Sequence, residues 1–242
     1  MTPLASAEYL DAIGTQTDRL VQAAEQAGLD ARVPSCPEWD VAELLGHMGR
    51  VYGWARACVE ANQFVSPGEL AGPPPPPERA AWVRDQSGKV VAALDRPADT
   101  PAWTWAPSGN VAFWQRRQAH ETVVHRVDAE LAAGALTPVP PRLAVDGIDE
   151  LLELLPHLIG VAPPTGHGET VHLHCTDQDG EWLARITEHG LEVERTHAKG
   201  DVAARGNASD LFLVLMRREP PDRVEVLGDR AVLDRFLAQA KF

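Results

Sequence analysis

The sequence lacks long apolar runs, a signal-peptide pattern and closely spaced cysteines, and each absence excludes a class of protein. No run of about eighteen apolar residues occurs in the 242 residues, so a membrane-spanning helix of the usual length is not expected. The N-terminal stretch MTPLASAEYLDAIG has no basic region followed by an apolar core, so a signal peptide is not expected either. The three cysteines are widely spaced without a C-x-x-C pair, which favours reduced thiols over disulfides. We therefore expect a cytoplasmic protein.

Basic residues are also in deficit, and lysine occurs only at Lys89, Lys199 and Lys241. The formal net charge of −13 argues against a nucleic-acid partner, because neutralising phosphates needs clustered lysine and arginine. The sequence also lacks the G-x-S-x-G elbow of serine hydrolases and any glycine-rich phosphate loop. Nucleic-acid binding is thus excluded from the expected functions, and nucleophilic serine chemistry has no support.

The chain does have an apolar content of 44%, which is ample for a packed core. The periodicity of its apolar residues differs between the two halves. The first half has helical periodicity. It predicts helices at about 5–28, from Asp40 to about 61, at about 78–95 and at about 110–134. Asp40 followed by Glu43 is a capping-box pattern, and the run Pro73–Pro77 predicts a stiff connector. Four helices with short to moderate loops favour a four-helix bundle.

The second half changes to an alternation of apolar and polar residues. After a linker at 135–145 and a short helix at about 146–160, the segments ETVHLHCT, WLARIT, LEVERTH and DVAARG predict an antiparallel meander. A helix at about 207–218, the strand RVEVLG and a helix at about 229–240 complete the pattern. We therefore expect an α+β protein of two domains, 1–137 and 143–242.

The helix at 110–134 carries polar residues in an arrangement suited to metal binding. Glu121 and His125 lie about 40° apart on its circumference, with Asp128 close by, whereas His120 diverges from His125 by about 140°. His47 lies on or beside the apolar stripe of the second helix, which should face the bundle interior. His47, Glu121 and His125 would form a three-ligand set with an open fourth position, the usual form of a catalytic zinc site.

Other interpretations of these residues stay open. The Glu121 and His125 pair could be a solvated surface pair, or Arg117 could form an internal ion pair with Glu121 or Asp128 without any metal. His47 alone could be a hydrogen-bonded core histidine.

Two weaker candidate sites lie elsewhere. Cys36 precedes the Asp40 helix but has no assigned base, so a buried thiol is the simpler interpretation than a nucleophile. His172 and His174 alternate on one strand face and could bind metal, although two histidines on an edge face are typically just exposed.

Longer segments resemble one known family over nearly the whole chain. The segments SCPEWDVAELLGHMGRVYGWA and FWQRRQAHETVVHRVDAE resemble the metal-ligand signatures of the mycothiol-dependent maleylpyruvate isomerase family. VHLHCTDQDGEWLARIT, HAKGDVAARGNASDLFLVLMRR and VEVLGDRAVLDRF are similar to its C-terminal domain, and the segments follow in the expected order.

This resemblance implies a DinB-like four-helix bundle followed by a sterol-carrier-like α+β domain with an antiparallel sheet. It implies a divalent metal, usually zinc, held at His47, Glu121 and His125. Mycothiol, the low-molecular-weight thiol of actinobacteria, would be the thiol cosubstrate, because metal coordination deprotonates a thiol. Arg205 matches a recurrent arginine of the second domain and would supply a cation for the substrate, unless it is a strand-end surface arginine.

Three functions remain in view. The first is a mycothiol-dependent metalloenzyme, an S-transferase or a cis-trans isomerase, in which a zinc-bound thiolate attacks a small electrophile. The second is a non-catalytic small-molecule binding protein, and the third is a metal-dependent hydrolase. Asp128 could support a histidine ligand, with Arg117 as the alternative that neutralises it. The expected partners are small molecules, with no nucleic acid or membrane, and the protein is expected to be a monomer or small homo-oligomer.

Overall fold

The computed structural model describes residues 4–158 and 162–240. The chain divides into two compact units, Leu4–Thr137 and the residues from Pro138 onward. The first unit is helical, and the second combines helices with one five-stranded sheet. This confirms the expected α+β class with two different halves.

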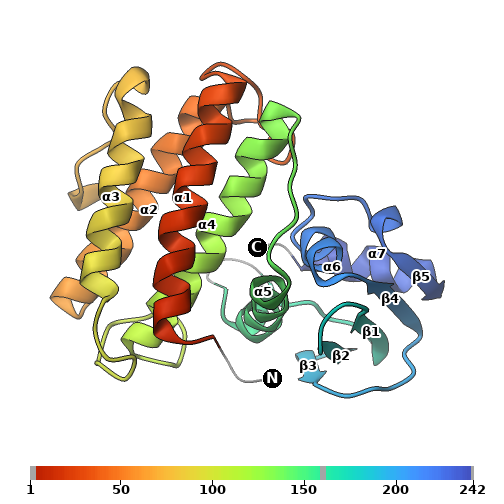
Figure 1. Cartoon of the computed structure of the whole chain (residues 1–242). Helices are drawn as coiled ribbons and strands as arrows, with labels where there is room; N and C mark the ends of the chain where they lie inside the picture. The colour runs from red at the N-terminus through yellow and green to blue at the C-terminus, as the bar shows by residue number, and fades with distance from the viewer. Residues whose placement is uncertain (1–3, 159–161, 241–242) are drawn as a thin grey trace. The chain divides into compact units, whose positions relative to one another are not determined.

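The helical unit consists of four long helices that lie side by side (Figure 1). They are α1 (Ser6–Ala27), α2 (Val41–Ala61), α3 (Arg79–Leu94) and α4 (Val111–Ala133), all within one or two residues of the predicted bounds. Helix α1 packs against α3 and α4, and α2 also packs against α3 and α4. Between α2 and α3 the chain forms two single-turn 3₁₀ helices, Pro67–Glu69 and Pro76–Glu78. The second contains the last two residues of the proline run, so the expected stiff connector Pro73–Pro77 ends in a helical turn, whose first positions need no N–H donor.

The ends of α2 and α4 follow from local chemistry. Asp40 accepts a hydrogen bond from the Glu43 backbone N–H, and the Glu43 carboxylate accepts one from the Asp40 N–H, both at 2.8 Å, which confirms the capping box. Asn110 caps α4 in the same way, by accepting from the Phe113 N–H. At the other end Gly134 takes a φ of +67°, the left-handed conformation that glycine adopts without strain. Local contacts thus define both ends of α4, the helix that carries Glu121 and His125.

One close contact sets the spacing of α2 and α3. A Cβ atom placed on Gly49 would lie 2.2 Å from the ring of Trp82, well inside van der Waals contact. The absence of a side chain at Gly49 therefore lets the indole of α3 lie directly on the backbone of α2.

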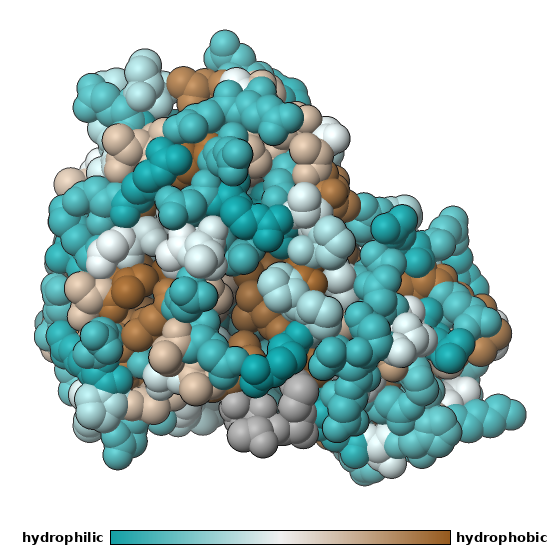
Figure 2. Space-filling view, in the orientation of Figure 1, coloured by the Kyte–Doolittle hydropathy of each residue, from teal (hydrophilic) through white to brown (hydrophobic). Residues whose placement is uncertain are grey.

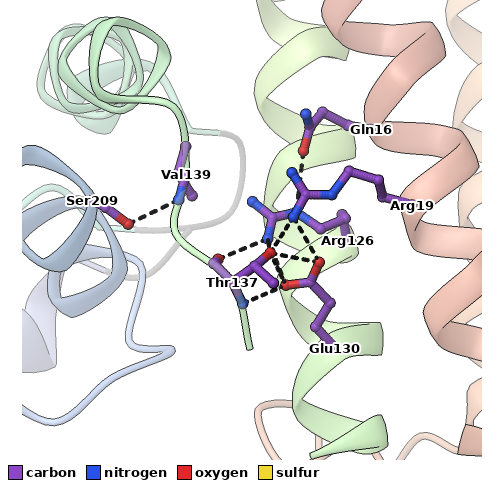
Figure 3. Close-up of polar contacts among 7 residues, drawn as sticks. All are labelled: Gln16, Arg19, Arg126, Glu130, Thr137, Val139 and Ser209. Atoms are coloured by element: carbon purple, nitrogen blue, oxygen red, sulfur yellow. Dashed lines mark hydrogen bonds and ion pairs between the residues drawn. The ribbon is translucent and has the colours of Figure 1, made fainter. Parts of the chain in front are cut away.

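A buried polar cluster lies between α1, the C-terminal part of α4 and Thr137, the last residue of the helical unit (Figure 3). The fully buried Arg126 donates to Gln16 of α1 at 3.1 Å and to Glu130 of α4 at 2.6 Å. It also donates to the carbonyl of Thr137, while Glu130 accepts from the Thr137 N–H and Arg19 pairs with Glu130. Glu130 thus pairs with two arginines, and these contacts hold the end of this unit against α1 and α4.

The second unit begins with α5 (Pro141–Leu154), which starts earlier than the predicted linker allowed. Pro140 is the N-cap and Pro141 the first helical residue, where a missing N–H costs nothing, so the prolines begin the helix instead of preventing it. Val139 is fixed just before by its N–H bond to the Ser209 hydroxyl at 2.9 Å (Figure 3). A 3₁₀ turn, Leu155–His157, ends the helix, and the predicted extension to 160 passes outside the described residues.

The sheet has the strand order β3-β2-β1-β4-β5. Strands β1 (Glu169–Cys175), β2 (Glu181–Thr187) and β3 (Gly190–Glu194) form the predicted antiparallel meander. The expectation of a wholly antiparallel sheet is wrong at one place, because β4 (Val202–Gly206) pairs parallel to β1 instead of continuing beside β3. Strand β5 (Glu225–Gly228) then pairs antiparallel with β4.

One face of this sheet is the core of the second unit. Val171 and Leu173 of β1 are fully buried beside Val202 and Ala204 of β4. Helices α6 (Ala208–Leu215) and α7 (Arg230–Gln239) pack on these two strands. The side chains of His172 and His174 alternate with this set and therefore lie on the opposite face.

The surface carries no extended apolar area on the side seen in Figure 2, where hydrophobic residues lie scattered among hydrophilic ones. Among the described residues, no helix is both long enough and apolar enough to cross a membrane.

Candidate metal centre

Three side chains from two helices converge in the helical unit. His47 comes from α2, and Glu121 and His125 come from successive turns of α4. The Nε2 atoms of His47 and His125 lie 3.2 and 3.3 Å from the same carboxylate oxygen of Glu121, Oε1. The structure therefore brings together the three residues that the sequence predicted as a ligand set.

These separations suit a metal ion. Zinc bonds of about 2.0–2.2 Å in a tetrahedral shell place neighbouring ligand atoms about 3.4 Å apart. The two distances to Glu121 Oε1 nearly equal that value, and one ligand atom from each of the three residues lies within 4.8 Å of the others. Two imidazoles and a carboxylate are typical zinc donors, so the residues present fit such an ion.

Behind His125 lies a fixed carboxylate. Asp128, one turn further along α4, is fully buried and places Oδ2 2.7 Å from His125 Nδ1. The Ser35 hydroxyl donates to the other oxygen of Asp128. Because the Nδ1 atom is engaged with Asp128, Nε2 is directed to Glu121 and is the nitrogen available to a metal ion.

Arg117 occupies the other side of Glu121. Its guanidinium lies 3.4 Å from Glu121 Oε2, so the predicted ion pair with Glu121 is present, and it occupies the oxygen that does not face the histidines. The alternative pair with Asp128 is wrong, because eleven residues of helix separate the two Cα atoms by about 16 Å. Arg117 and the histidines thus share one carboxylate without competing for the same atom.

The charges of the cluster follow from these contacts. Burial alone would raise the pKa of the Glu121 carboxyl, but hydrogen bonds from His125 and His47 and the nearby charges hold this pKa well below its usual value. Burial would lower the pKa of His125, yet the bonds to Asp128 and Glu121 outweigh burial and raise it to about 9. Glu121 is therefore an anion, as a metal ligand must be.

The loop before α2 adds residues that spacing arguments missed. The ring of Trp39 lies 4.8 Å from the His47 ring and 6.0 Å from the His125 ring. Backbone bonds from Val33 to Trp39 and from Val41 to Ala31 fold this loop tightly, which brings Ser35 to Asp128. The only sequence signal for these residues was the segment SCPEWD, through its family resemblance. Trp39 covers one side of both histidines.

The remaining predicted residues lie elsewhere. His120 is buried and meets Tyr9 of α1 edge-on, away from the three candidate ligands. Arg205 lies on β4 of the second unit, where it is half exposed and pairs with Glu225 at 3.2 Å. Cys36 is half-buried in the loop before α2. The role of Arg205 stays a prediction.

Comparisons with known proteins bear on the whole chain. Residues 10–130 match the family model described as the mycothiol maleylpyruvate isomerase N-terminal domain, and residues 142–235 match the MDMPI C-terminal domain. No curated protein matches the sequence.

Solved structures of similar fold include the mycothiol-dependent maleylpyruvate isomerase and its histidine-to-alanine variant, both 14% identical. The variant has a TM-score of 0.63 and the other structure 0.61, and each match covers 93% of this chain and 95% of the other. A ubiquinone synthesis protein titled UbiJ-SCP2 covers 43% of this chain at a TM-score of 0.30, too low to establish a common fold. Because the two family models together match most of the sequence, the chain belongs to the mycothiol maleylpyruvate isomerase family.

Proposed function

We propose that this protein is a metalloenzyme that joins the thiol of mycothiol to a small electrophilic substrate, with cis-trans isomerisation as one outcome and S-transfer as the other. The observation that carries the proposal is the convergence of His47 and His125 on one oxygen of Glu121. Family membership supports the choice of mycothiol, and the similar maleylpyruvate isomerase structures make maleylpyruvate the first electrophile to test.

In this proposal, the three convergent side chains hold the metal and leave one coordination position open. When bound, a divalent ion such as zinc supplies the positive charge that keeps a coordinated thiol deprotonated near neutral pH. Asp128 orients His125, and Arg117 fixes the rotation of the Glu121 carboxylate by engaging its second oxygen. Trp39 shields the histidines from solvent on one side.

We propose further that Arg205 provides the cation for the carboxylate or developing enolate of the substrate. Its half-exposed guanidinium leaves part of its hydrogen-bonding capacity accessible beside Glu225. The alternative is that Arg205 only forms a structural ion pair with Glu225. In steady-state kinetics, Arg205→Ala should lower kcat/KM, whereas Glu225→Ala, which breaks the same ion pair, should not. Equal losses in the two variants would assign Arg205 to the ion pair alone.

The first test is metal content by elemental mass spectrometry on protein purified without a histidine tag. His47→Ala and Glu121→Ala should each lose one metal equivalent relative to wild type. His189→Ala removes an exposed histidine in the turn between β2 and β3, and it should lose none. Unchanged metal content in both ligand variants would overturn the proposed site.

The second test measures turnover of maleylpyruvate with and without mycothiol. Turnover should require both the thiol and the metal. Metal-dependent turnover that is unaffected by omitting the thiol would indicate a hydrolase instead. Binding of the substrate without any turnover in the loaded protein would indicate a binding protein.

A further inference from the structure

A second group of potential ligands lies in the other unit, remote in sequence from the first. One ligand atom from each of four residues lies within 4.8 Å of the others; we call these residues the sheet cluster, formed by His172, His174, Glu181 and His197. None of them has a part in the proposed thiol chemistry.

Two strands provide the base of the sheet cluster. His172 and His174 stand two apart on β1, so their side chains share one face of the sheet. In the antiparallel register, Glu181 of β2 lies directly opposite His174, and the two side chains are in contact. Neighbouring strands thus present two imidazoles and a carboxylate on the face away from the core.

The fourth member comes from the segment between β3 and β4. Since the strand order is β3-β2-β1-β4, this segment must cross β2 and β1 to reach the far side of β1 (Figure 1). His197 lies on this crossing, with Nδ1 3.0 and 3.1 Å from the two oxygens of Glu181. The three imidazole rings stand with centroids 5.7–6.2 Å apart, so they surround a common point instead of stacking.

His172 gives an independent indication of a ligand. The residue is only 7% exposed, and its Nε2 atom is buried without a hydrogen-bond partner among the described residues. A buried ring nitrogen without a partner costs free energy, and native proteins rarely tolerate one. The expectation that His172 is simply exposed is therefore wrong: β1 is a central strand, and the crossing segment covers this face.

We propose that the sheet cluster is a second metal site, which binds a zinc-like divalent ion in a structural role. Three imidazole nitrogens and one carboxylate oxygen favour zinc over calcium or magnesium, which prefer all-oxygen shells. Four protein ligands complete a tetrahedral shell, so this site has no open position for a substrate. It differs in that respect from the three-ligand centre of the helical unit.

Such an ion would fasten the β3–β4 crossing to the sheet. His197 is the only member with a largely exposed side chain, at 80%, and it contributes the one ligand that is not on a strand. Lys199, two residues further on, is exposed and is a cleavage site for trypsin. Occupation of the sheet cluster should therefore protect the peptide bond after Lys199.

The binding test uses the full-length Glu121→Ala protein, in which the centre of the helical unit is disabled. Titration with zinc should show one equivalent bound and a higher thermal midpoint, since an ion that binds only the folded state stabilises it. Adding His174→Ala or Glu181→Gln to this background should abolish both effects, and adding His189→Ala should leave both intact. A thermal midpoint measured without zinc shows whether each variant folds.

The second test is limited trypsin digestion of the same proteins, followed by mass spectrometry of the fragments. Zinc should slow cleavage after Lys199 in the Glu121→Ala protein and have no effect once His174 is also replaced. The proposal is overturned if the Glu121→Ala protein binds no zinc, or if it binds zinc equally well with and without His174. Either result leaves the His47 centre untouched, because that centre is tested by its own variants.

Discussion

His125 Nδ1 lies 2.7 Å from a carboxylate oxygen of Asp128, one turn further along the same helix. A buried carboxylate behind an imidazole fixes its orientation and raises its basicity toward a metal on the opposite nitrogen. This pair suggests that Asp128 contributes to metal affinity without touching the metal.

We expect Asp128→Asn to weaken zinc binding by about 10- to 100-fold, the range typical for partners of ligand histidines. Competition with a chromophoric chelator measures the affinity. Ser35→Ala keeps the carboxylate and removes only its hydroxyl partner, so its effect should be smaller. If Asp128→Asn binds zinc as tightly as wild type, the carboxylate has no part in holding the ligand.

Because Gly49 lies against the ring of Trp82, we expect a side chain at position 49 to disrupt the packing of α2 on α3. Gly49→Ala would place a methyl group 2.2 Å from the indole and force α2 and α3 apart, at a cost of about 1–3 kcal/mol in unfolding free energy. Gly88→Ala is the matched control, because it lies on the exposed face of α3 with nothing within 4 Å of the new Cβ. It should stabilise the protein by about 0.5–1 kcal/mol. Urea unfolding measures both, and equal effects would contradict this packing.

The buried ion cluster at the end of α4 predicts a large loss of stability on truncation. Arg126→Ala leaves Glu130 buried without its main partner and should cost about 3–5 kcal/mol. Arg84→Ala breaks exposed pairs with Asp18 and Glu25 between α3 and α1, and should cost about 1 kcal/mol or less. Chemical denaturation of the two variants side by side tests the difference. A cost for Arg126→Ala no greater than that for Arg84→Ala would show that the cluster adds little.

Because Tyr52 is buried, we expect the free energy of unfolding to fall at high pH. Burial raises the pKa of its hydroxyl well above the ordinary value of about 10, although Thr122 and Thr17 bond to it. Its contribution to stability is therefore complete below about pH 10 and is lost as the pH rises further, since the unfolded chain ionises first. Unfolding free energies measured between pH 9 and 11 should fall more steeply in wild type than in Tyr52→Phe. Parallel curves would exclude Tyr52 as the cause.

The cysteines should prove dispensable if the reactive thiol comes from mycothiol. Burial raises the pKa of the Cys58 thiol and raises that of Cys175 to about 12, so neither should react with an alkylating reagent at pH 8. Cys36 is half-buried and should be modified first. Peptide mapping after alkylation of the native protein identifies the modified sites. Activity of Cys36→Ser near the wild-type level would agree with an external thiol, and its abolition would point to a protein nucleophile.

Local patterns in the sequence predicted most of the elements and the three residues of the candidate metal centre, which the structure brings together. The capping box at Asp40 and the apolar stripe after it located α2, because both signals lie within a few residues. The spacing of Glu121 and His125 placed them on one side of α4 for the same reason. His47 could be assigned because its helix has one face that must be buried.

Contacts between residues that are far apart along the chain were decided by the tertiary structure. Strand β4 pairs with β1 and not with β3, because pairing depends on which edge the folded unit leaves available, and the period-two pattern is the same for either partner. The sheet cluster depends on that crossing, which alone brings His197 to Glu181. Ser35 likewise reaches Asp128 only through the folded loop before α2. The sequence by itself thus determined the helices, most of the strands and the candidate ligand residues, and only packing determined which of them meet.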